Sequence, residues 1–216
     1  DASLFIFNNT RKGIKENEQK TIIVFNDGSN ACAFNLQANL EKGSVLNIYN
    51  VCTTEKNARL NETIVLNKEG ATCNILNVLL VGGNATLESN IMLMHMCKET
   101  SSDFANYAIA VDDANMVLNN NAKIVKGASK SVVRQKAKGL TLSKSDFSIY
   151  KNNIKQLVDF ARFNLSQSSE EIKKLCQKYS INPKIIPIPK FFDKTITKIA
   201  KSAGIYSVLS LKDGGF

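Results

Sequence analysis

The fold is predicted by residues 57–96, NARLNETIVLNKEGATCNILNVLLVGGNATLESNIMLMHM. Short runs such as ETIVLN and NILNVLL contain β-branched and other apolar residues in alternation, as strands do. Between these runs, a Gly or Asn is followed by a small residue. Gly and Asn adopt the left-handed backbone conformation that a tight corner needs, and a small residue fits against a neighbouring corner. The pattern predicts short strands joined by sharp corners.

The corner pairs recur at nearly constant spacing, with separations of 15, 14, 13 and 14 residues. Such spacing indicates a stacked solenoid, in which each coil covers the hydrophobic edge of its neighbour. A plain β-sandwich is the alternative, although its loops would vary more and it would contain more aromatic residues. The predicted corners are Gly28-Ser29, Gly43-Ser44, Asn57-Ala58, Gly70-Ala71 and Asn84-Ala85.

The composition suits one sizeable core and a small appended module, with 216 residues of which 44% are hydrophobic. The net charge of +9 is uneven: residues 1–120 carry 9 Lys/Arg and 13 Asp/Glu, a net of −4, and residues 121–216 carry the remaining +13. This asymmetry favours a basic surface that meets an acidic partner. No apolar run is long enough to cross a bilayer, so no membrane partner is expected.

The strand pattern ends near Lys151. Ile154, Leu157, Val158, Ala161 and Leu165 then form one helical stripe. All three prolines fall within residues 181–190, which are expected to be extended. We therefore predict two domains: a β-solenoid core over residues 1–150 and a small helical or α+β appendix over residues 151–216.

Residues 90–150, and by their periodicity residues 20–90, resemble the SufB/SufD family, the scaffold subunits of the SUF iron–sulfur cluster assembly machinery. His95 precedes Thr100-Ser101, a strand leads to the corner Asp112-Asp113-Ala114, and the segments NNNAKIVKGASKS and RQKAKGLTLSKSD follow in the family's order. The resemblance implies a right-handed parallel β-helix. It also implies a SufC-type ATPase as partner, together with a second SufB/SufD-like subunit or a second copy of this chain.

Two departures from the family pattern concern function. The Ser-His motif that usually follows the last strand is absent, because the chain turns instead into NNIKQLVDFARF. Ala137 also stands where SufB-type members have a cysteine. The chain therefore resembles SufD more than SufB, with a truncated or diverged C-terminal part.

His95 and Cys97 are the candidate metal ligands. His95 is the only histidine, and residues two apart on a strand face the same side, so the two side chains could share a metal ion or a transient iron–sulfur cluster. The alternative is that both pack in the core beside neighbouring methionines, since two ligands do not complete a site. The five cysteines include no CxxC pair, which favours reduced thiols and a cytoplasmic or organellar matrix location.

Basic residues cluster in residues 121–146, where the apolar Ile124, Val125, Val132 and Val133 are expected to fill the interior. A solvated sheet face is one interpretation, and attraction to an acidic partner is the other. The run lacks interleaved aromatic residues for base stacking, which argues against nucleic acid. The candidate partner-binding residues are Lys126, Lys130, Arg134, Lys136 and Lys138.

These observations favour a scaffold that is not an enzyme and that takes part in iron–sulfur cluster assembly with an ABC-type ATPase. With one histidine, the sequence indicates no Ser/Cys–His–Asp arrangement; catalysis through a lysine or a carboxylate pair stays open, although Asp112-Asp113 is expected to be a turn. A surface β-solenoid for adhesion or carbohydrate binding is the first alternative, and a basic nucleic-acid-binding domain is the second. Glycans would favour the first of these, at the sequons Asn8, Asn61, Asn84 and Asn164.

Overall fold

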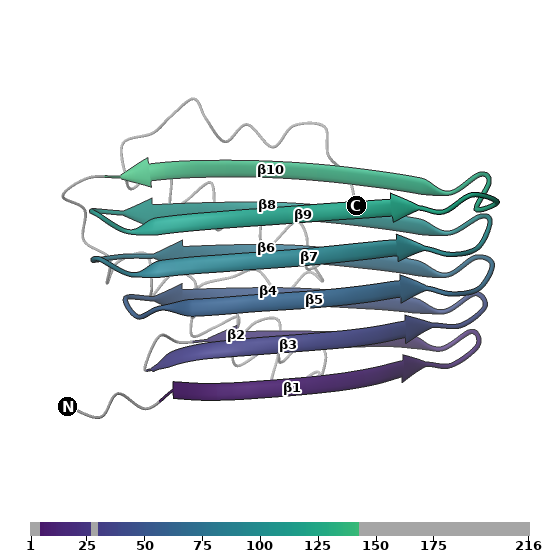
Figure 1. Ribbon diagram of the computed structural model, residues 1–216, viewed down its shortest axis with the longest axis horizontal. Helices are drawn as coiled ribbons and strands as arrows, with labels where there is room; N and C mark the ends of the chain where they lie inside the picture. The colour runs from purple at the N-terminus through teal and green to yellow at the C-terminus, as the bar shows by residue number, and fades with distance from the viewer. Residues whose placement is uncertain (1–4, 27–29, 143–216) are drawn as a thin grey trace, which may run out of the picture. The chain divides into compact units, whose positions relative to one another are not determined.

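The computed structural model describes residues 5–26 and 30–142 (Figure 1). These residues form ten strands and contain no helix, including none that could cross a membrane. The appendix expected over residues 151–216 lies outside the described residues. The strands are β1 (Phe5–Ile14), β2 (Gln19–Asn26), β3 (Ala31–Leu40), β4 (Val45–Thr54), β5 (Ala58–Leu66), β6 (Thr72–Val81), β7 (Thr86–His95), β8 (Ser101–Val111), β9 (Asn115–Ile124) and β10 (Val132–Leu142).

The strands alternate between two parallel sheets. The odd-numbered strands form one sheet in the order β1-β3-β5-β7-β9, and the even-numbered strands form the other in the order β10-β8-β6-β4-β2. Figure 1 shows the two sheets running in opposite directions, with successive coils stacked from β1 to β10. This confirms the predicted parallel β-solenoid, and it excludes a sandwich built from antiparallel hairpins.

Corners lie where the Gly/Asn pairs predict them. Residues 43–44, 57, 70–71 and 84–85 fall at or beside strand ends, while Gly28-Ser29 lies outside the described residues. Gly43, Gly70 and Gly83 have φ of 62°, 72° and 62°, the left-handed conformation that favours glycine. Gly43 and Gly70 also stack, since a Cβ added to Gly70 would lie 3.7 Å from the Cα of Gly43.

The coils lengthen toward the C-terminal end of the solenoid. Register partners are 26 residues apart between Phe5 and Ala31, and 31 residues apart between Ser101 and Val132. The strands themselves hold 8 to 11 residues throughout. The additional residues therefore lie in the corners, and the longest corner is residues 125–131, between β9 and β10.

Alternate residues of each strand point inward and form the core. In β5, the even-numbered residues Ala58, Leu60, Glu62, Ile64 and Leu66 are buried, and the odd-numbered residues between them are more exposed. Parallel neighbours repeat the same parity, so apolar side chains stack from coil to coil. The main cluster comprises Ile14, Leu36, Ala38, Leu40, Leu46, Ile48, Ile64, Leu66, Ala71, Cys73, Ile75, Ile91, Leu93 and Phe104.

Two residues of the basic run do not fill the interior as expected. Val132 is 41% exposed and is in register with Ser101, on the outward-facing parity of its sheet. Ile124 has the inward parity of its partner His95 but is 48% exposed, because β9 is the last strand of its sheet among the described residues. The sequence pattern predicted strands in this coil, but it did not predict which of their apolar side chains are buried.

Two asparagine ladders run across the coils. On the outer face of the odd-numbered sheet, the Nδ2 of Asn61, Asn90 and Asn119 each donates to the Oδ1 of the asparagine one coil earlier, at 2.7 to 2.9 Å. In the interior, Asn50 Nδ2 donates to Asn77 Oδ1 at 2.8 Å and Asn77 Nδ2 donates to Asn106 Oδ1 at 2.7 Å. Each ladder fixes the register of its sheet, because a one-residue slip would turn its amides to the opposite face.

Candidate functional site

His95 is the last residue of β7 and is fully buried. Its Nδ1 lies 2.8 Å from Thr100 Oγ1, and its Nε2 lies 2.9 Å from Ser102 Oγ. Burial lowers the pKa of His95, which keeps the ring neutral. Thr100 Oγ1 also lies 2.8 Å from Ser131 Oγ and 3.1 Å from the Cys97 carbonyl oxygen. When its hydrogen goes to that carbonyl, Thr100 Oγ1 accepts from His95 Nδ1–H, and Nε2 accepts from the Ser102 hydroxyl.

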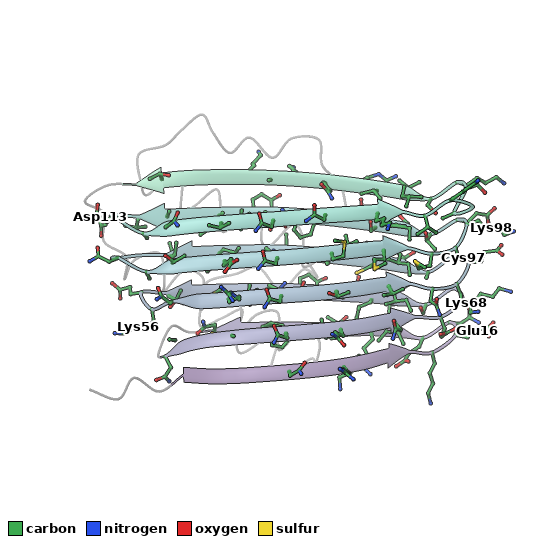
Figure 2. All side chains as sticks on the ribbon, viewed as in Figure 1. Glu16, Lys56, Lys68, Cys97, Lys98 and Asp113 are labelled. Atoms are coloured by element: carbon green, nitrogen blue, oxygen red, sulfur yellow. The ribbon has the colours of Figure 1, made fainter. Side chains whose placement is uncertain are left out.

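Cys97 lies beyond the end of β7, in the corner 96–100 (Figure 2). It takes part in the hydroxyl network through its backbone carbonyl, which also accepts from Ser131 Oγ at 3.2 Å. Its thiol is half-buried. The network thus joins the corner 96–100 to the corner 125–131 of the following coil. In this arrangement both ring nitrogens of His95 are hydrogen-bonded to hydroxyl groups.

No group of three or more His, Cys, Asp or Glu side chains gathers anywhere in the part of the chain that the structure describes. A metal ion at His95 would have to displace Thr100 or Ser102 from the ring. The assignment of His95 and Cys97 as metal ligands stays a prediction, which cluster reconstitution can test.

The five candidate partner-binding residues lie together on the last described coil. Lys126 and Lys130 are exposed in the corner 125–131, and Arg134, Lys136 and Lys138 alternate along the outward face of β10. Lys130 Nζ lies 3.3 Å from Glu99 Oε1, and Arg134 Nη1 lies 3.3 Å from Asp103 Oδ2, both acids of the preceding coil. Part of the charge is therefore paired within the solenoid, and the partner-binding role stays a prediction.

The core contains a buried carboxyl group that was not predicted from the sequence. Glu62 of β5 is 2% exposed, and its Oε1 accepts from Asn50 Nδ2, at the start of the interior asparagine ladder, at 2.9 Å. Burial raises the pKa of Glu62 to about 7, against the lowering effect of the Asn50 hydrogen bond. The signal was present in the sequence, because residue 62 has the same parity as the core residues Leu60 and Ile64.

Several other interior polar atoms have no protein partner among the described residues. Buried polar groups of this kind normally bind ordered water. The interior of the solenoid therefore contains polar side chains beside its apolar core. Acceptors predominate over donors in this set, and bound water would supply the missing hydrogens. The atoms are Asn50 Oδ1, Glu62 Oε2, Ser89 Oγ, Asn106 Nδ2 and Asn120 Oδ1.

Two sheets of parallel strands that alternate along the chain define the class of parallel β-solenoid proteins. Residues 14–146 match the family described as SUF system FeS cluster assembly, SufBD core domain. The match covers more than half of the chain and includes β2 to β10. The chain belongs to the SufB/SufD family and takes part in iron–sulfur cluster assembly by the SUF system. No curated protein and no solved structure matches it.

Proposed function

We propose that this chain is a non-catalytic scaffold subunit of the SUF system. It works with a SufC-type ATPase and with a second SufB/SufD-like subunit or a second copy of itself, in the cytoplasm or in an organellar matrix or stroma. The observation that carries the proposal is the family match, which extends over nearly the whole described solenoid. The cluster is cargo that the assembly builds and passes on.

The last described coil supplies a surface suited to a subunit partner. Among the described residues, β10 pairs only with β8, and β9 pairs only with β7. An edge strand offers unpaired backbone donors and acceptors to a second strand, and lysines on that edge discourage indiscriminate pairing. A partner with acidic side chains in register with Lys136 and Lys138 would be favoured.

The test is co-expression of this chain with the SufC-type ATPase and the other SufB/SufD-like protein of the same genome. The expected result is a complex that survives affinity purification and size exclusion. Lys126→Glu combined with Lys136→Glu should weaken association with the subunit partner at least tenfold, because two attractions become repulsions. Lys56→Glu combined with Lys68→Glu is the matched control, since it reverses two exposed charges in other corners.

Each outcome bears on the proposal. Loss of binding in both double variants would mean that total charge, and not the terminal coil, governs association. Failure to bind either protein, under conditions where those two proteins bind each other, would overturn the scaffold role.

A further inference from the structure

Two thiols meet inside the solenoid at the corner between β2 and β3. The amide nitrogen Asn26 Nδ2 lies 2.8 Å from Cys32 Sγ and 3.5 Å from Cys52 Sγ. The two sulfur atoms are therefore at most 6.3 Å apart, the sum of these distances. Both side chains point inward: Cys52 is 1% exposed, and Cys32 is in register with the buried Ala58.

Cys32 is the accessible member of the pair. It is half-buried and lines a cavity of about 340 Å³ together with Asn57, Arg59 and Glu88. Cys32 lines this cavity and Cys52 does not; Cys52 belongs to a cluster of core residues that Cys32 packs against. A disulfide requires the two sulfur atoms to move from their separation of at most 6.3 Å to the bond length of about 2.05 Å.

The other described thiols differ in their surroundings. Cys73 is fully buried and lies near the carboxyl group of Glu62. Cys97 occupies the corner 96–100, at the opposite end of the strands from the corner that contains Lys56 (Figure 2). Cys32 is the second residue of β3, which starts at the end of the strands where Lys56 lies, so Cys97 is about a strand length away from the pair.

We propose that Cys32 and Cys52 are a redox modification site that closes to a disulfide when a peroxide enters the cavity. The Cys32 thiolate attacks one peroxide oxygen, an S–O bond forms, the O–O bond breaks, and hydroxide leaves. The Cys52 thiolate then attacks the Cys32 sulfur, an S–S bond forms, the S–O bond breaks, and hydroxide leaves. The two protons that the thiols released convert both hydroxides to water. In all, the two thiols lose two electrons, and the peroxide gains them and is reduced to two waters.

Asn26 is a positioning residue in this scheme, because its amide holds both sulfur atoms at one point. The bond would tie the start of β3 to the end of β4, and thus one sheet to the other. Burial raises the pKa of both thiols, so the reaction should be slow at neutral pH and accelerate as pH rises. The inference does not depend on the role in cluster assembly.

The experiment treats the fully reduced chain with one equivalent of hydrogen peroxide, blocks remaining thiols, and maps tryptic peptides under non-reducing conditions. Trypsin cleaves after Lys20, Lys42 and Lys56, so Cys32 and Cys52 fall in separate peptides, 21–42 and 43–56. Cys73 and Cys97 share the peptide 69–98. The expected product is the linked pair 21–42 with 43–56, accompanied by the loss of two thiols per chain.

Three variants sharpen the result. Cys73→Ser should form the same linked pair as the wild type, and Asn26→Ala should form it several-fold more slowly. Cys32→Ser should retain the Cys52 thiol. The wild-type peptide map does not depend on any variant folding. A linkage that involves another cysteine, oxidation of Cys32 to the sulfinic acid with Cys52 still reduced, or no loss of thiols would each overturn the proposal.

Discussion

Glu62 is the residue whose ionisation opposes the fold. Its pKa of about 7 in the folded chain lies above the ordinary value of 4.5. Between pH 4.5 and pH 7, Glu62 is therefore protonated in the folded chain and ionised in the unfolded chain. The stability that this proton contributes is complete below about pH 4.5 and is lost as pH rises to about 7. Glutamine resembles the protonated side chain without its ionisation.

Glu62→Gln should therefore have little effect near pH 4.5 and should stabilise the chain above pH 7. The expected gain is on the order of 3 kcal/mol, since each pKa unit corresponds to about 1.4 kcal/mol. Urea unfolding at pH 5 and pH 8.5 measures the difference. The matched control is Glu88→Gln, in which the sign reverses: hydrogen bonds from Asn90 and Arg59 lower the pKa of Glu88, so its ionised form favours folding. A pH-independent effect at Glu62 would contradict the assignment.

His95 shows how a lone histidine can serve the core. Because both ring nitrogens are hydrogen-bonded to hydroxyls, anaerobic reconstitution with iron and sulfide should give no cluster absorbance that depends on His95 or Cys97. His95→Ala should instead lower the midpoint of thermal unfolding, since Thr100 and Ser102 lose a buried partner. Absorbance that disappears in both His95→Ala and Cys97→Ser would establish a metal site there.

The sequence could predict some of these residues and not others. Parity along the strand identifies Glu62 as an inward carboxyl group, once the strand is recognised. The partners of His95 were beyond reach, because Thr100 lies in a corner and Ser102 lies in the next strand, and their approach depends on the path of that corner. The thiol pair likewise joins residues 32 and 52 through Asn26, whose proximity arises only from coil stacking.

At the scale of the elements, the corners test how tightly the coils stack. Gly43 and Gly83 have the same φ of 62°, but a Cβ at Gly43 would collide with Asn17 Oδ1, whereas one at Gly83 meets nothing within 4 Å. Gly83→Ala should cost about 1 kcal/mol from the left-handed backbone alone, and Gly43→Ala should cost more. Denaturant unfolding in the Asn17→Gly background is the check, because there the two costs should become equal. A gap between them that persists in that background would exclude Asn17 as its cause.

The two asparagine ladders allow a second matched comparison. Asn77→Ala removes the middle rung of the interior ladder. Asn50 Nδ2 keeps its bond to Glu62 Oε1, but the buried Asn106 Oδ1 loses its donor, at about 1–3 kcal/mol. Asn90→Ala removes a middle rung of the outer ladder, where water can replace the lost bonds, so it should cost less than 1 kcal/mol. Equal losses in the free energy of unfolding would show that the interior amides are already hydrated.

The residue types at the corners allowed several corners to be predicted from the sequence. The spacing of the corners did not predict which residues of a coil are exposed. Gly or Asn followed by a small residue marks the corners near residues 43, 57, 70 and 84, whereas the corners 15–18, 96–100 and 125–131 were not predicted from such pairs. The exposure of Val132 and Ile124 was not visible, because it depends on register and on where the stack of described strands ends.

For the whole molecule, we predict self-association or pairing with a paralogue through the last coil. Val132 N–H donates to Thr100 O at 2.9 Å, so the N–H of Val133 points away from β8, toward the edge of β10 that no other described strand pairs with, as alternation in a parallel ladder requires. Val133→Pro should abolish dimers in light scattering at micromolar concentration without lowering thermal stability. Val132→Pro is the contrast, since it breaks a bond within the solenoid and should destabilise the monomer. A strict monomer, alone and mixed with its genomic neighbours, would refute the pairing.

The gradual lengthening of the coils bears on how such a chain can change over generations. A residue inserted into a strand would reverse the facing of every side chain after it, and selection would remove it. A residue inserted between an odd-numbered strand and the next even-numbered one is absorbed, as the corner of seven residues at 125–131 shows beside that of four residues at 15–18. A whole coil can likewise be gained or lost with its pairing intact. Descendants of this chain should therefore differ in length by complete coils or at those corners, while the lining of the solenoid stays the same.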